Sequence, residues 1–191
     1  MKIADCQILF TTTLSRTRIV APERTPLNKI AASVLEMARA YESDGITFFV
    51  SRDPVNALAG FYYGLGWLHF GLSSGLLAIT HPQGCPFSVP QEKLPPQFKS
   101  KLEEKTDRYA HLLDTAMSSV RCASDPATTS HDFAGRILAV AAVYARNGDY
   151  CRKYGESENA LASYSYGHGW LDAGVTAGYF RIVAERDLFT I

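Results

Sequence analysis

The sequence contains an internal repeat. When the chain is aligned with itself at an offset of 103 residues, residues 41–77 fall on residues 144–180, and 13 of these 37 positions are identical. Both tryptophans of the protein become one aligned pair, Trp67 and Trp170. A repeat this long predicts two similar structural units rather than one fold that uses the whole chain.

The repeat divides the chain into three parts. We expect a first repeat at residues 1–80, a linker at residues 81–97 and a second repeat at residues 98–191. The linker holds five of the nine prolines, which favours an extended connector.

Both repeats show the spacing of amphipathic helices. Apolar residues recur every three or four positions, as in Leu27, Ile30, Ala31, Val34, Leu35, Ala38 and Tyr41. The pattern predicts helices at about 1–19, 26–52, 54–79, 98–122, 130–153 and 157–187. No segment alternates with period two for long enough to compete as a strand. We therefore expect an all-α fold of two tandem three-helix up-and-down bundles, packed as a pseudo-twofold pair.

Glycines form a stripe along the third helix of each repeat. A glycine inside a helix costs roughly 1 kcal/mol relative to alanine, so the stripe needs a compensating contact. Close helix packing is the favoured interpretation and a ligand groove the alternative, and we expect the two third helices to cross each other. The candidate packing residues are Gly64, Gly71, Gly75, Gly167, Gly174 and Gly178.

His168 and Asp172 are the most suggestive polar pair. They stand one helical turn apart, which can orient an imidazole or offer two metal ligands. The first repeat has Leu65 and His69 at these positions, so the pair is not duplicated. Because two ligands are too few for a metal site, we expect a structural contact, with metal binding or catalysis as the alternative. No metal or other cofactor is predicted.

Three further residues of the same helix are candidates for binding. Asn159, Tyr166 and Trp170 share one helical face, where they either fill the core or form the floor of a ligand pocket. If the second interpretation holds, the pocket lies in the second repeat and also includes His168 and Asp172.

Charge and hydropathy restrict the partners. The chain has 19 basic and 19 acidic residues, which argues against broad phosphate neutralisation and hence against a nucleic-acid partner. Val55–Thr80 is uncharged and long enough to cross a bilayer. Its counterpart in the second repeat contains Asp172, however, so a buried helix is favoured over a membrane span. The four cysteines form no Cys-x-x-Cys pair, and reduced thiols in the cytoplasm are expected.

The stretch from Glu158 to Gly174, with its Gly-Trp-Leu-Asp-Ala-Gly core, resembles an archaeal family known as domain of unknown function 357. The resemblance implies an up-and-down three-helix bundle and an archaeal source, and it supplies no reaction. The first repeat departs from the pattern, because His69 and Phe70 replace the Asp-Ala of the second repeat.

These observations favour a soluble binding or scaffold protein without catalysis, which acts on a protein partner or by self-association. The alternative is an enzyme, or a small-ligand or metal binder, with its pocket around His168 and Asp172. Whether the chain is an enzyme stays open at this point.

Overall fold

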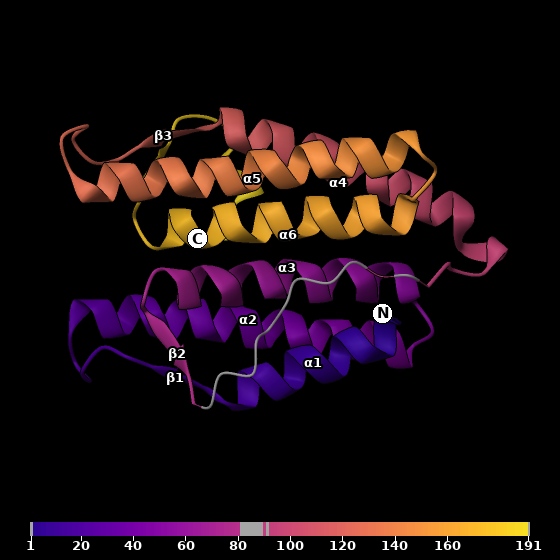
Figure 1. Cartoon of the computed structure of the whole chain (residues 1–191), viewed down its shortest axis with the longest axis horizontal. Coiled ribbons are helices and arrows are strands. Elements are labelled where there is room, and N and C mark those ends of the chain that lie inside the picture. Colours follow the sequence, from indigo (N-terminus) through magenta and orange to yellow (C-terminus); the bar gives the residue numbers. More distant parts are fainter. Residues whose placement is uncertain (1, 81–89, 91, 191) are drawn as a thin grey trace.

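The computed structural model describes residues 2–80, 90 and 92–190. In these residues the fold is all-α, as predicted, with three long helices in each repeat (Figure 1). The helices are α1 (Ile3–Ser15), α2 (Pro26–Val50), α3 (Pro54–Ser73), α4 (Lys99–Ser118), α5 (Thr129–Lys153) and α6 (Ser157–Thr176). Between and after them lie four short strands, β1 (Thr17–Ile19), β2 (Leu77–Ile79), β3 (Val120–Cys122) and β4 (Phe180–Ile182).

Two helices of the first repeat begin at the residues that the sequence indicates. Thr25 accepts a hydrogen bond from the backbone N–H of Asn28, directly before Pro26. Asp53 caps α3 in the same way, through the N–H of Asn56. These caps satisfy backbone donors that the first turn leaves without helical partners.

The first and third helices of each repeat are shorter than predicted, because strands follow them. β1 pairs antiparallel with β2, and β3 pairs with β4. Each strand has only three residues, so it leaves no alternation long enough to detect in the sequence. The prediction of no strands was therefore wrong. The two-stranded ribbons tie the end of the first helix to the end of the third helix in the same repeat.

Helices α3 and α6 lie side by side at the centre of the molecule (Figure 1). Helices α1 and α2 cover α3 on one side, and α4 and α5 cover α6 on the other. Because each central helix is covered by its own repeat and by its counterpart, almost every residue of α6 is buried.

Close packing inside each bundle follows the repeat. A Cβ on Gly45 of α2 would lie 2.6 Å from a ring carbon of Phe61, and one on Gly148 of α5 would lie 2.6 Å from a ring carbon of Tyr164. Phe61 and Tyr164 occupy the same repeat position. In both bundles, the missing Cβ of this glycine therefore leaves room for one aromatic ring.

The predicted linker falls only partly within the described residues. Residues 81–89 and 91, which include Pro82 and Pro86, lie outside them. A single turn of 3-10 helix spans Pro96–Phe98, and α4 begins directly after it.

Candidate functional site

The backbones of α3 and α6 meet at Gly66 and Gly169. A Cβ on Gly66 would lie 2.5 Å from the carbonyl oxygen of Tyr166, and one on Gly169 would overlap the carbonyl oxygen of Tyr63. Real Cβ atoms essentially never come within 3.0 Å of such atoms. The third helices thus pack against each other as expected, but they do so through a glycine pair outside the predicted stripe.

The glycines of that stripe have other surroundings. Gly64, Gly71, Gly167 and Gly174 face side chains of their own repeats. Gly75 and Gly178 lie beyond the ends of α3 and α6, with φ of +75° and +83° and nothing within 4 Å of an added Cβ. These two residues supply left-handed backbone at the turns into β2 and β4.

Two hydrogen bonds join the repeats on either side of the glycine pair. The hydroxyl of Tyr63 donates to Oδ2 of Asp172 at 2.6 Å. The hydroxyl of Tyr166 lies 2.9 Å from Nδ1 of His69. The two tyrosines occupy equivalent repeat positions, and so do His69 and Asp172. The contacts are therefore reciprocal, with a carboxylate at one end and an imidazole at the other.

Asp172 is fully buried and binds the chain that follows β4. Its Oδ1 accepts the backbone N–H of Thr190 at 3.0 Å, and its Oδ2 accepts the Thr190 hydroxyl at 2.7 Å. No Lys or Arg among residues 2–80, 90 and 92–190 forms an ion pair with it. Neutral donors alone hold this carboxylate in the interior.

His168 binds the same segment. Its Nε2 lies 3.2 Å from the carbonyl oxygen of Leu188, which fixes this nitrogen as the protonated one. In the part of the chain that the structure describes, no hydrogen bond joins His168 to Asp172. The helical pair is therefore a pair of anchors for the segment Leu188–Thr190.

Burial dominates the titration of this region. It lowers the pKa of His69 to about 4, and it lowers the pKa of His168 against the opposing charge of Asp172. It also raises the pKa of Tyr63 well above its usual value, helped by Asp172. At neutral pH both imidazoles are neutral and Tyr63 is a donor. None of these three groups is tuned towards neutral pH, where a general acid or base works best.

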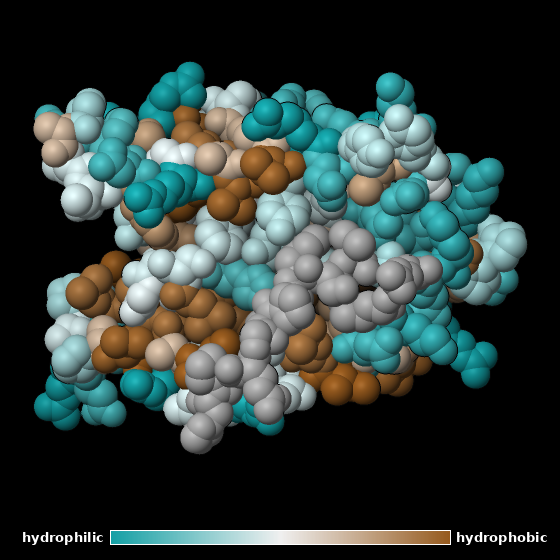
Figure 2. All heavy atoms as spheres, in the orientation of Figure 1, coloured by the Kyte–Doolittle hydropathy of each residue, from teal (hydrophilic) through white to brown (hydrophobic). Residues whose placement is uncertain are grey.

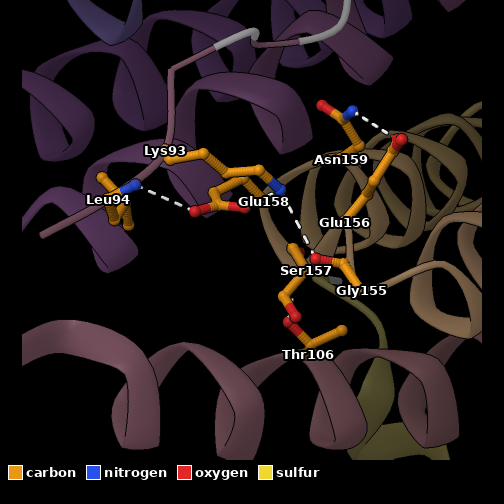
Figure 3. A network of polar contacts seen from close by, with 8 residues as sticks. All are labelled: Lys93, Leu94, Thr106, Gly155, Glu156, Ser157, Glu158 and Asn159. Atoms are coloured by element: carbon orange, nitrogen blue, oxygen red, sulfur yellow. Dashed lines mark hydrogen bonds and ion pairs between the residues drawn. The ribbon is translucent and has the colours of Figure 1, made fainter. Parts of the chain in front are cut away.

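Asn159 lies apart from the other candidates. It precedes His168 by nine residues, about 13 Å along a helix. Its amide nitrogen donates to Oε2 of Glu156 at 2.9 Å (Figure 3). Its Oδ1 is buried without a partner among the described residues. The structure therefore does not bring Asn159 to His168 and Asp172.

Tyr166 and Trp170 lie where the two repeats meet. Their rings are 5.9 Å apart, and Trp170 meets Phe70 of the first repeat edge-on at 6.3 Å. Trp170 is buried. Both residues thus pack between the repeats.

The five candidate residues line neither of two cavities found in the described part of the molecule. One of about 430 Å³ lies at the start of α6, where Glu158 accepts the N–H of Leu94 at 2.9 Å and pairs with Lys93 at 3.2 Å (Figure 3). The other, of about 350 Å³, lies between the start of α1 and the end of α2, with Phe49 and Arg52 in its wall.

A family model described as a protein of unknown function, DUF357, matches residues 8–77 and matches again at residues 108–180. The chain belongs to this family. The double match confirms the resemblance and the tandem duplication. No curated protein and no solved structure matches the chain.

The contacts between the repeats that the sequence did not reveal involve residues of both DUF357 repeats. As the repeat counterpart of Tyr166, Tyr63 is expected to fill the core, and His69 is marked only as the counterpart of Asp172. The signal was present, because Tyr63 and Tyr166 are identical while the residues that face them differ. Thr190 carried no signal, since it lies outside the aligned repeat.

One hydrolase-like motif in the first DUF357 repeat does not lie on the turn that its catalytic role requires. Gly71–Gly75 reads Gly-Leu-Ser-Ser-Gly, which fits the Gly-x-Ser-x-Gly pattern. A nucleophile of that type sits on a sharp turn between a strand and a helix. Here the first serine, Ser73, is the last residue of α3, so the motif does not form that elbow.

Two other kinds of feature are absent from the described residues. No group of three or more His, Cys, Asp or Glu side chains is placed to hold a metal ion there. None of the helices described has both the length and the apolar character needed to cross a bilayer.

Proposed function

We propose that this DUF357 protein is a non-catalytic binding module, in which two bundles form a rigid scaffold for a protein partner. One observation carries the proposal. The polar side chains best suited to chemistry are used to join the repeats and to anchor the segment after β4, through Tyr63–Asp172, Tyr166–His69 and His168–Leu188.

The proposal includes a pseudo-twofold relation between the repeats. The reciprocal contacts support it, because exchanging the two repeats converts the Tyr63–Asp172 bond into the Tyr166–His69 bond. The ring pairs Tyr41–Tyr63 and Tyr144–Tyr166 also match, each with centroids 4.4 Å apart. Contacts of this kind are those of an isologous dimer interface. Light scattering should accordingly find a monomer, and an obligate higher oligomer would count against an internal pair.

The surface of the first repeat supports a protein partner. Ile8 of α1 is 65% exposed and Val50 of α2 is 75% exposed. In the view of Figure 2, hydrophobic residues gather over the first repeat, while hydrophilic residues predominate over α4 and the outer face of the second. Grouped exposed apolar side chains are typical of protein-binding surfaces.

The partner surface is tested with matched variants. We expect Ile8→Glu and Val50→Glu to leave the thermal unfolding midpoint nearly unchanged and to abolish co-purification of a partner from the host. Val143→Glu is the control, because Val143 is 54% exposed in the second repeat. If the control removes the partner equally, or the first-repeat variants retain it, this surface is not the binding site.

The alternative is an enzyme or a small-ligand or metal binder around His168 and Asp172. Metal analysis and a thermal-shift screen of metabolites test it. The scaffold proposal expects His168→Ala and Asp172→Ala to lower the unfolding midpoint without changing the response to any metabolite or metal. A metabolite or metal response that wild type shows and both variants lose would establish the alternative.

A further inference from the structure

The segment after β4 is bound to α6 in the manner of a recognised peptide. We call residues 186–190 the strap. After one turn of 3-10 helix at Arg186–Leu188, Phe189 is extended, with φ −116° and ψ 142°. The carbonyl of Leu188 and the N–H of Thr190 then point to α6, where His168 and Asp172 bind them. His168 and Asp172 thus bind backbone groups on either side of Phe189. The Phe189 side chain itself packs in the core and is 7% exposed.

The strap also contacts the first repeat. The hydroxyl of Thr190 binds Oδ2 of Asp172, the oxygen that also accepts from Tyr63 of α3. Tyr41 of α2 is partly buried, and it lies near enough to Thr190 and Asp172 for both to influence its pKa, which burial raises. The groove beneath the strap is therefore formed by α2, α3 and α6 together. It exists only because the two repeats are packed against each other.

The chemistry of the groove selects its occupant. Asp172 is a fully buried carboxylate with no cation paired to it among the described residues. Besides the hydroxyl of Tyr63, its donors are an N–H and an O–H of a single residue of the strap. An occupant that lacked both would leave a buried charge with too few hydrogen bonds. An extended peptide with an aromatic residue followed by threonine or serine provides both donors and fills the site of Phe189.

The backbone conformation directly before the strap is unfavourable and opposes its binding to α6. Glu185, directly before the 3-10 turn, has a φ of +47°, a left-handed conformation that a non-glycine residue adopts at a cost in free energy. Release of the strap relieves this strain. A tethered segment otherwise competes at an effective concentration in the millimolar range, so an incoming peptide binds only when the strap opens.

We propose that the face of α6 around His168 and Asp172, with Tyr41 and Tyr63, is a recognition groove for an extended segment of a partner protein that carries an aromatic residue followed by a hydroxyl residue. The strap occupies this groove within the same chain. The inference goes beyond the proposed function, because the groove differs from the exposed surface of α1 and α2. Its test uses a peptide of this chain rather than the partner itself, so either proposal can fail without the other.

The test uses a fluorescein-labelled peptide with the sequence of residues 183–191 and the full-length chain. The double substitution Phe189→Ala and Thr190→Val weakens the strap and leaves the groove intact. By fluorescence anisotropy, we expect this variant to bind the peptide at least tenfold more tightly than wild type does. Adding Asp172→Asn to the variant should weaken binding about tenfold, and so should replacing the threonine of the peptide by valine.

Two results would overturn the proposal. One is a folded double variant that shows no saturable binding of the peptide. The other is equal binding of the threonine and valine peptides. Hydrogen exchange of the wild-type protein gives a second measurement if the variant does not fold. The amide of Thr190 should exchange through local opening, at least tenfold faster than the amides of α6. Exchange of Thr190 only with global unfolding would make the strap a permanent part of the core and exclude the groove.

Discussion

At both ends of the α3–α6 contact a tyrosine of one central helix bonds to a side chain of the other, but the side chain that it meets differs. At one end Tyr63 meets Asp172, a buried carboxylate that also takes two hydrogen bonds from Thr190. At the other end Tyr166 meets His69, a partly exposed imidazole that burial keeps neutral. The residues that correspond to the strap in the first repeat, 83–87, lie outside the described residues.

The difference shows where the two repeats have diverged. The tyrosines and glycines that set the geometry are identical, whereas the residue that receives the tyrosine changes from histidine to aspartate. A buried carboxylate requires several donors, and Asp172 takes them from Tyr63 and Thr190. Aspartate at this position therefore accounts for the hydrogen bonds that Thr190 makes at the Asp172 end.

The largest effect should come from a change that disrupts both ends at once. Gly66→Ala and Gly169→Ala each place a Cβ against backbone of the opposite central helix, which has no flexible side chain to move aside. We expect each to cost more than about 3 kcal/mol of unfolding free energy, the upper range for overpacking. Urea denaturation measures the loss.

The control for that prediction is Gly135→Ala on α5, where an added Cβ has nothing within 4 Å. Its repeat counterpart is already alanine, Ala32. The control should stabilise the protein by up to about 1 kcal/mol through helix propensity. Similar stabilities for Gly169→Ala and Gly135→Ala would show that the central helices do not pack as closely as described.

The second prediction compares the two ends directly. Asp172→Ala leaves the donors of Tyr63 and Thr190 without their acceptor in the interior, and we expect a loss of about 3 kcal/mol. His69→Ala removes the neutral hydrogen bond to Tyr166 at a partly exposed site and should cost about 1 kcal/mol. Parallel urea titrations test the ranking, and Asp172→Asn should recover part of the loss. Equal losses at both positions would remove the distinction between the ends.

Much of the fold could be predicted from the 103-residue repeat and from the three- and four-residue spacing of apolar side chains. The pairing of Trp67 with Trp170 indicates the duplication, and the helix starts predicted at residues 26 and 54 are those of α2 and α3. The strands could not be predicted, since three residues are too few to show a period.

The candidate site was predicted only in part. His168 and Asp172 were recognised as polar residues on a buried helix, but their partners come from elsewhere in the chain. Tyr63 is 109 residues from Asp172, and Thr190 is 18 residues away on a segment without repeat identity. The pairing depends on how α6 packs against α3, and spacing within one helix does not contain that information. Gly66 and Gly169 were overlooked for the same reason.

The third prediction concerns the pH dependence of stability that protonation of His69 causes at its end of the contact. Burial lowers the pKa of His69 from 6.5 to about 4. The unfolded chain therefore binds a proton between these values that the folded chain does not bind, and the free energy of unfolding falls as pH is lowered from 6.5 to 4. The full shift corresponds to about 3 kcal/mol, and we expect about 2 kcal/mol because His69 partly reaches solvent.

His69→Gln is the informative comparison for the pH effect, because glutamine retains a polar contact to Tyr166 and does not titrate. Unfolding midpoints of wild type and variant, measured from pH 7 to pH 4, should converge as the pH falls. His168, whose pKa burial also lowers, contributes alike to both proteins. A constant difference between the two curves would show that His69 is not the group responsible.

The smallest effects should come from the glycines just beyond the central helices, where both repeats leave open space around the same turn. Gly75→Ala and Gly178→Ala force a Cβ into left-handed backbone at φ of +75° and +83°, with open space around both. The penalty is conformational alone, about 1 kcal/mol at each position, and thermal or urea unfolding measures it. Because the turns from α3 to β2 and from α6 to β4 share their geometry, the two losses should agree within experimental error, unlike those at His69 and Asp172. A clearly larger loss at Gly178 would mean that divergence at the Asp172 end extends through α6 into the turn that precedes the strap.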